Sequence, residues 1–256
     1  MSHTSRRRRP VLVAALLIPI SLALSGCSFD SKNISGMGFP KDLTSVNEIS
    51  ISLWQGAWIA AGVVGLITLV LILWPAVFHR AKVGQSEFPK QTQYNIPVEI
   101  LYTIIPFIIV AVLFYFTAVK QEKIIDKTSP VKHEITVEGI QWSWQFGYPE
   151  AGDNAIVTGT PAQPPTLYLP RGEKVRFTLT ANDVVHGFWI PAFMIQMQNL
   201  PGETNHLQFT ANKLGEFPGR CNILCGRNHS QMLFTVKVVT PEQYQNYLDS
   251  LKASAA

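Results

Sequence analysis

Two long apolar runs constrain the fold of this chain more than any other feature. Residues 57–78 and 100–119 contain no charged side chain. Each run is about 20 residues long, enough for a helix that crosses a hydrocarbon core of roughly 30 Å. Trp54, Trp58 and Trp74 lie near the ends of the first run, as aromatic anchors do at a membrane interface. A buried helix of a soluble protein is the alternative, but two such runs close together favour a transmembrane pair.

The charged residues give the two predicted helices an orientation. The segment between them carries Arg80, Lys82 and Lys90 against Glu87, and loops rich in Lys and Arg stay in the cytoplasm. Because the connecting segment is then cytoplasmic, we expect a multi-pass protein of the bacterial plasma membrane, in contact with lipid, whose C-terminal domain is extracytoplasmic. From Lys120 to the end, 12 Lys and Arg balance 12 Asp and Glu, which leaves no basic face for nucleic acid.

The N-terminus has the pattern of a bacterial lipoprotein signal. Arg6–Arg9 precede an apolar stretch, and small residues follow it directly before Cys27. The pattern predicts residues 1–26 as a signal peptide, Cys27 as a lipid-modified residue and residues 27–50 as an extracytoplasmic tether. The alternative is a short membrane anchor in which Cys27 has no special role.

Beyond the apolar runs, the hydrophobic pattern changes to a period of two. Val175, Phe177 and Leu179 alternate with polar residues, and Gly and Pro punctuate several such segments, as in an all-β sandwich or barrel. A strand is also expected where Ile140, Trp142, Trp144 and Phe146 alternate. We place the two-helix transmembrane hairpin at residues 51–122 and the β-domain at residues 123–256.

The C-terminal segment predicts a short helix. Thr240 is followed by Pro241 and, three residues on, by Gln243, which is the pattern of a capping box with proline in the first turn. An apolar face follows at helical spacing, formed by Tyr244, Tyr247, Leu248 and Leu251.

A cluster of soft metal ligands lies late in the chain. Cys221, Cys225, His229 and Met232 fall within twelve residues, and His186 precedes them near the end of a predicted strand. Thiolate, imidazole and thioether together favour copper over calcium or magnesium. A Cys221–Cys225 disulfide is one alternative, and a closed zinc site, which would leave the methionine unexplained, is another.

Three segments resemble cytochrome c oxidase subunit II, in particular its actinobacterial members. The first is Cys-x3-Cys-x3-His-x2-Met with an upstream Asp-Val-Val-His, and the others are residues 141–149 and 98–106. The resemblance covers nearly the whole chain after residue 26 and implies a cupredoxin-like Greek-key barrel on a two-helix hairpin. It also implies a binuclear copper centre, CuA, held by His186, Cys221, the carbonyl of Ile223, Cys225, His229 and Met232.

The same resemblance implies a function and partners. Electrons from cytochrome c would pass through CuA to haem in subunit I, where oxygen is reduced to water with proton translocation. Subunit III would complete the enzyme, and the weak net charge of the domain suits a donor held in the membrane or in a supercomplex. Trp142 occupies the position where electrons enter, and Glu99 the entrance of a proton channel. Packing of Trp142 in the barrel and a headgroup-facing Glu99 are the alternatives.

The chain departs from the family at a second metal site. The middle residue of the cysteine loop is usually glutamate and here is Ile223, while Gln196 and Gln198 replace a usual lysine and aspartate. We therefore expect the magnesium site of the family to be absent or altered. Three functions compete with the oxidase: a quinol oxidase subunit, which would lack the ligands, a membrane-anchored copper-delivery protein, and a CuA-dependent nitric oxide reductase.

Overall fold

The computed structural model describes residues 34–80, 84 and 91–255. The predicted signal peptide and Cys27 lie outside these residues. After a short 3₁₀ turn, η1 (Ile34–Gly36), the chain forms α2 (Asn47–Phe78) and α3 (Ile96–Ile124). Both helices are long and apolar enough to cross a membrane, which agrees with the two predicted runs.

Helix α2 begins at Asn47, where the chain still contacts the β-domain, while the predicted hairpin begins at residue 51. Two residues near the start of α2 are buried: Asn47 is fully buried, and Ile51 is 1% exposed. The amide N–H of Asn47 donates to Thr44 Oγ1 at 3.0 Å, and its side chain donates to the carbonyl of Ala192 at 3.5 Å. The end of the predicted tether is therefore packed against the domain that it precedes.

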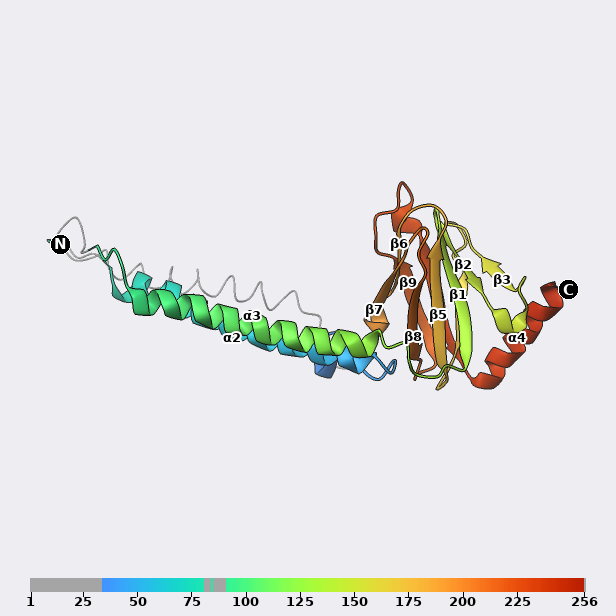
Figure 1. Cartoon of the computed structure of the whole chain (residues 1–256), viewed down its shortest axis with the longest axis horizontal. Helices are drawn as coiled ribbons and strands as arrows, with labels where there is room; N and C mark the ends of the chain where they lie inside the picture. Colours follow the sequence, from blue (N-terminus) through green and yellow to red (C-terminus); the bar gives the residue numbers. More distant parts are fainter. Residues whose placement is uncertain (1–33, 81–83, 85–90, 256) are drawn as a thin grey trace, which may run out of the picture. The chain divides into compact units, whose positions relative to one another are not determined.

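The β-domain consists of two five-stranded sheets that pack face to face (Figure 1). The pairs β1–β5 and β4–β10 are parallel and the other neighbours antiparallel. This is the predicted cupredoxin-like arrangement. The first sheet has the order β3 (Ile156–Thr158), β2 (Ser143–Gly147), β1 (His133–Ile140), β5 (Lys174–Ala181), β8 (Asn205–Thr210), and the second β4 (Thr166–Pro170), β10 (Leu233–Val239), β9 (Gly215–Cys221), β6 (His186–Ile190), β7 (Ile195–Asn199).

The predicted alternation positions an aromatic core between the sheets. Strand β5 alternates buried and half-buried residues along its whole length. Phe188 and Phe234 stack with ring centroids 5.0 Å apart, and Trp144 lies edge-on to Phe234 at 5.4 Å. Gly219 makes room for this group, since a Cβ there would lie 2.1 Å from the Phe234 ring. This core lies directly beneath the cysteine loop, because the indole N–H of Trp144 donates to the carbonyl of Met232 at 3.5 Å.

The prediction of one strand from Ile140 to Phe146 is wrong. Strand β1 ends at Ile140, and β2 starts at Ser143 as its antiparallel partner. Gln141 and Trp142 therefore form the turn of a tight hairpin. Trp144 and Phe146 are fully buried, as expected for core residues, whereas the turn leaves Trp142 half-buried at the edge of the domain.

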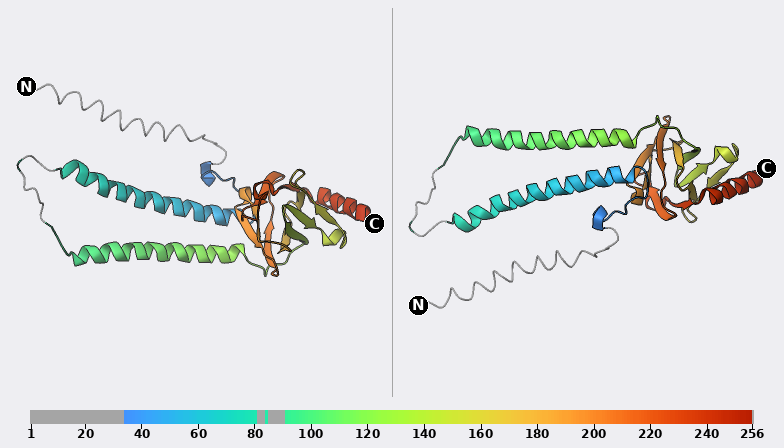
Figure 2. Two further views of the ribbon diagram at one scale, coloured as in Figure 1. Left: turned by 90° about the horizontal axis from the view of Figure 1, so that it is seen from above. Right: turned by 90° about the horizontal axis from the view of Figure 1, so that it is seen from below.

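The C-terminal helix α4 (Pro241–Ala255) has the predicted start and face. Thr240 Oγ1 accepts from the amide of Gln243 at 3.2 Å, and Gln243 Oε1 accepts from the amide of Thr240 at 3.1 Å. Tyr244 and Leu248 are buried, and Tyr247 stacks on Tyr168 of β4 at 4.0 Å. Figure 2 shows α4 at the C-terminal end of the β-domain.

Candidate metal centre

Two strand ends bring the distant ligands together. Strand β6 begins at His186 and β9 ends at Cys221, and these strands are antiparallel neighbours in which Phe188 pairs with Cys221. The loop after Cys221 returns to β10 and is closed at its base, where the amide of Cys221 donates to the carbonyl of Met232 at 3.0 Å. The sheet thus holds one imidazole against a loop that carries the thiols.

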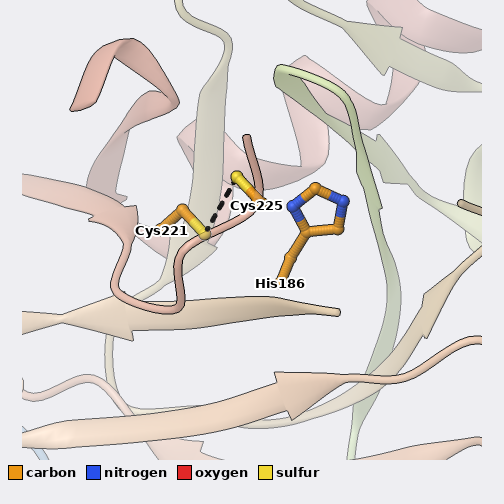
Figure 3. Close-up of side chains that lie close together, drawn as sticks. All are labelled: His186, Cys221 and Cys225. Atoms are coloured by element: carbon orange, nitrogen blue, oxygen red, sulfur yellow. Dashed lines mark hydrogen bonds between the residues drawn. The ribbon is translucent and has the colours of Figure 1, made fainter. Parts of the chain in front are cut away.

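Three ligand atoms form the centre of the site. The side-chain ligand atoms of His186, Cys221 and Cys225 all lie within 4.8 Å of one another, and all three residues are buried. Figure 3 shows the His186 ring with one nitrogen directed toward the two sulfurs. The sulfurs are 3.8 Å apart and unbridged, compared with about 2.05 Å in a disulfide. The disulfide alternative is therefore not the state of this structure.

The remaining predicted ligands lie against the same two sulfurs. The carbonyl oxygen of Ile223 is 3.2 Å from Cys221 Sγ. On the other side, His229 Nδ1 is 3.6 Å and Met232 Sδ is 3.7 Å from Cys225 Sγ. The structure therefore gathers all six predicted ligand groups around the thiol pair.

His186 has the hydrogen bonding of a metal ligand. Its Nε2 donates to Asp183 Oδ1 at 2.8 Å, while its buried Nδ1 has no hydrogen-bond partner among the described residues. A carboxylate on one ring nitrogen fixes the proton there and leaves the other lone pair for a metal. Gly139 of β1 makes space for the ring, because a Cβ there would lie 2.7–2.9 Å from His186 atoms. This unpartnered nitrogen beside two thiols fits a soft metal ion.

The two thiols differ in acidity. Burial raises the pKa of Cys221, but the adjacent His186 ring and the amide of Gly187 lower it more, so the net shift is downward. Burial and the neighbouring Cys221 sulfur both raise the pKa of Cys225. One thiol therefore ionises more readily than the other, and a metal that binds both as thiolates releases protons on binding.

The turn that contains Trp142 lies on the peptide of a ligand. The indole Nε1–H of Trp142 donates to the carbonyl of Cys225 at 3.2 Å, and the side-chain amide of Gln141 donates to the same oxygen at 2.8 Å. Gly226 adopts φ +122°, and a Cβ there would lie 3.0 Å from the indole nitrogen. The half-exposed indole is thus joined to the metal centre through one peptide group.

Glu99 lies apart from this centre, at the start of α3. Its carboxylate accepts from the amide of Asn95 at 3.1 Å, while Asn95 Oδ1 accepts from the amide of Val98 at 3.4 Å. Both contacts stabilise the helix N-terminus. Glu99 also lines a shallow pocket of about 270 Å³ on this helix. Helix capping is therefore one physical role of this carboxylate.

A neutral pocket borders the cysteine loop where the magnesium ligands of the family are expected. It has a volume of about 360 Å³ and is lined by Gln196, Met197, Gln198, Asn222 and Ile223. The side-chain amide of Asn222 donates to Gln196 Oε1. This lining carries amides and apolar side chains where magnesium prefers carboxylates.

Sequence reasoning missed the residues that support the ligands. Asp183 accepts hydrogen bonds from His186 Nε2 and from the backbone amides of Val184 and Gln141. Burial raises the pKa of Asp183, but these three donors lower it more, so its carboxylate is held in the ionised form. The only sequence signal was an aspartate three residues before a candidate ligand. Gly139 had no such signal, because its clash with His186 depends on the fold.

Known proteins of one family match this chain. Residues 162–239 match the family described as cytochrome c oxidase subunit II, periplasmic domain. Probable cytochrome c oxidase subunit 2 of Streptomyces avermitilis is 40% identical over an alignment of 284 positions that covers 95% of this chain and 88% of that protein. Cytochrome c oxidase subunit 2 of Mycobacterium tuberculosis is 33% identical over an alignment of 300 positions that covers 95% of this chain and 82% of that protein.

A solved structure is also similar. The periplasmic domain of subunit II of cytochrome oxidase from Bradyrhizobium japonicum is 28% identical, covers 50% of this chain and 99% of that one, and has a TM-score of 0.46. The full-length relatives decide the assignment, since the alignments span both the helices and the β-domain at 33–40% identity. The chain belongs to the cytochrome c oxidase subunit II family.

Proposed function

We propose that this chain is the electron-transfer subunit of a haem–copper terminal oxidase. It accepts electrons from cytochrome c at a binuclear copper centre and delivers them to haem in subunit I, where oxygen is reduced to water with proton translocation. The observation that carries the proposal is the buried Nδ1 of His186, which has no hydrogen-bond partner in the part of the chain that the structure describes, beside two unbridged thiols. The oxidase activity belongs to the whole complex, of which this chain is one subunit.

The ligand set favours copper over zinc. His186 and His229 would each offer one imidazole, Cys221 and Cys225 two thiolates, and Met232 a thioether. Copper in such a set changes its oxidation state by one electron, which is the chemistry that electron transfer needs. A closed zinc site takes four ligands and has no use for the thioether or the Ile223 carbonyl. The paired ends of β6 and β9 and the closed loop after Cys221 hold these groups in place, which suits a centre that must change charge with little rearrangement.

Other residues of the chain would serve the path of electrons and protons. Trp142 is proposed as the contact for the donor, since its half-exposed indole donates to the Cys225 carbonyl. Glu99 is proposed as the entrance of a proton channel, because an ionisable group at the edge of a membrane span is a functional candidate by default. The helices cross the plasma membrane with their connecting loop in the cytoplasm, and Cys27 carries lipid.

The magnesium site of the family is proposed to be absent or built differently. Ile223 provides only its carbonyl to the cysteine loop, and the adjacent pocket is lined by amides rather than carboxylates. Copper binding does not depend on this change, because the carbonyl belongs to the backbone.

Metal analysis and electron paramagnetic resonance of the full chain, purified in detergent with copper supplied, test the function. We expect two coppers per chain, a number set by the paired thiolates, and a mixed-valence signal in which one unpaired electron is shared between them. A Cys221→Ser, Cys225→Ser double variant is the matched control and should lose the signal. A mononuclear copper signal would reject the binuclear centre and favour a copper-delivery protein, and preferential zinc retention would reject the electron-transfer assignment and favour a zinc protein.

A further inference from the structure

The carboxylate of Asp183 connects two parts of the metal centre that come from different sheets. It lies just before β6 and is 30% exposed. Its Oδ1 accepts from His186 Nε2 at 2.8 Å and from the amide of Val184 at 2.6 Å. Its Oδ2 accepts from the backbone amide of Gln141, 42 residues away, at 2.6 Å.

The first contact sets the state of a ligand. Because the carboxylate accepts, His186 must carry its proton on Nε2, and Nδ1 keeps its lone pair on the side of Cys221 and Cys225. Gly139 lies so close to the ring that His186 has little room to turn. Without the carboxylate, the ring would have no fixed tautomer.

The second contact holds the turn that carries the indole. The amide of Gln141 is fixed by Asp183, and the side chains of Gln141 and Trp142 both donate to the carbonyl of Cys225. Two hydrogen bonds thus hold the turn against the carbonyl of Cys225. A third hydrogen bond, from the amide of Gln141 to Asp183, holds the backbone of the same turn.

We propose that Asp183 is a positioning residue that holds His186 in its metal-binding tautomer and Trp142 on the Cys225 peptide. One carboxylate thereby aligns the metal centre with the point where electrons would enter. The copper part rests on the proposed function, whereas the hold on the Gln141 amide can be tested without any metal.

Two substitutions separate the two contacts. Asp183→Ala removes both. Asp183→Asn replaces one carboxylate oxygen by an amide nitrogen. With its remaining oxygen at the position of Oδ1, the asparagine still accepts hydrogen bonds from His186 and from the amide of Val184. Its amide group then faces the N–H of Gln141, donor against donor, and this contact is lost. The control is Glu138→Gln, because Glu138 is a nearby carboxylate on β1 that accepts from Asn182 and does not contact the site.

The test measures copper binding and amide exchange on the full chain in detergent, using copper ions as the probe. In Asp183→Ala we expect copper affinity to fall by about 10- to 100-fold, as for loss of a carboxylate partner of a ligating histidine, with an altered paramagnetic spectrum. Asp183→Asn should restore the wild-type spectrum. The Gln141 amide, read by hydrogen–deuterium exchange, should exchange about tenfold faster in both variants, as for loss of a charge-assisted hydrogen bond, and at the wild-type rate in Glu138→Gln.

Each other outcome has a distinct meaning. A wild-type copper spectrum and affinity in Asp183→Ala would overturn the role at His186, and unchanged Gln141 exchange in both variants would overturn the role at Trp142. Asp183→Asn keeps the test valid if Asp183→Ala folds poorly. A wild-type chain that binds no paired copper would reject the proposed function, while the exchange rates would still decide whether Asp183 holds the turn.

Discussion

The indole nitrogen of Trp142 lies 3.2 Å from the carbonyl oxygen of Cys225 and donates a hydrogen bond to it. The contact joins a half-exposed aromatic ring to the buried Cys225 thiol, a candidate metal ligand, through a single peptide group. An electron that reaches the ring from a docked donor would have a continuous bonded and hydrogen-bonded route to the centre.

Trp142→Phe should slow electron acceptance while leaving the copper centre intact. Phenylalanine keeps an aromatic ring but cannot donate to Cys225, so we expect rapid-mixing rates with reduced cytochrome c to fall by about tenfold or more, or about 1.4 kcal/mol in activation free energy. Gln141→Ala removes the other donor to the same carbonyl and keeps the indole, and it should change the rate less. Equal losses in both variants would assign the effect to the carbonyl rather than to the ring.

Glu99→Gln should slow oxygen turnover several-fold without affecting reduction of the copper centre. Glutamine keeps an oxygen that can accept from the amide of Asn95, so the start of α3 stays capped and only the charge is lost. Oxygen consumption by the assembled oxidase and rapid copper reduction would be measured on the same preparation. Unchanged turnover would contradict a role of Glu99 in proton uptake and leave only its role in capping the start of α3.

An engineered pocket should gain a divalent ion. Ile223→Glu with Gln198→Asp adds two carboxylates to the amide-lined pocket beside the cysteine loop, and hard cations prefer such oxygen ligands. With manganese as a paramagnetic probe, we expect about one additional ion per assembled double variant. Stoichiometric manganese in the wild-type pocket would contradict the proposed loss of the magnesium site.

The gathering of Cys221, Cys225, His229 and Met232 could be predicted from the sequence because these residues lie in one short loop, while the full set of six candidate ligands was implied by the family resemblance. The apolar runs, the C-terminal helix and the presence of several short strands were predictable because hydrophobic periodicity and helix caps are local features of the sequence, whereas the cupredoxin-like arrangement was implied by the resemblance. The turn at Gln141 was not, because apolar residues alternate through it in the sequence, from Ile140 to Phe146, while the strand pairing ends at Ile140. The Asp183–Gln141 contact also could not be predicted, since it joins two turns that are 42 residues apart in the sequence.

The β-domain should become less stable in acid because of a buried cluster formed by His133, Glu150 and Glu173. His133 is 7% exposed at its side chain and lies between two carboxylates, with Nδ1 2.9 Å from Glu150 and Nε2 2.7 Å from Glu173. Its ring also packs edge-on against Tyr244 of α4 at 5.0 Å. The cluster therefore joins the first strand to the C-terminal helix.

The direction of the pH effect follows from Glu173. Burial raises the pKa of Glu173, but hydrogen bonds from Lys132 and His133 lower it more, and the net shift is downward. A carboxylate with a lowered folded-state pKa stabilises the fold above its ordinary pKa of about 4.3, and this contribution is lost as the pH falls through the folded-state value. We therefore expect thermal unfolding, followed by near-ultraviolet circular dichroism, to occur at progressively lower temperature below pH ~4.

Glu173→Gln should remove part of that dependence. The variant should unfold a few degrees lower than the wild type at pH ~7, the size expected for one partly exposed ion pair, and the difference should shrink as both are acidified. Glu203→Gln, at an exposed position in the turn after β7, is the matched control and should follow the wild-type curve. If the unfolding temperatures of Glu173→Gln and the wild type fall in parallel as the pH is lowered, the acid sensitivity has another source.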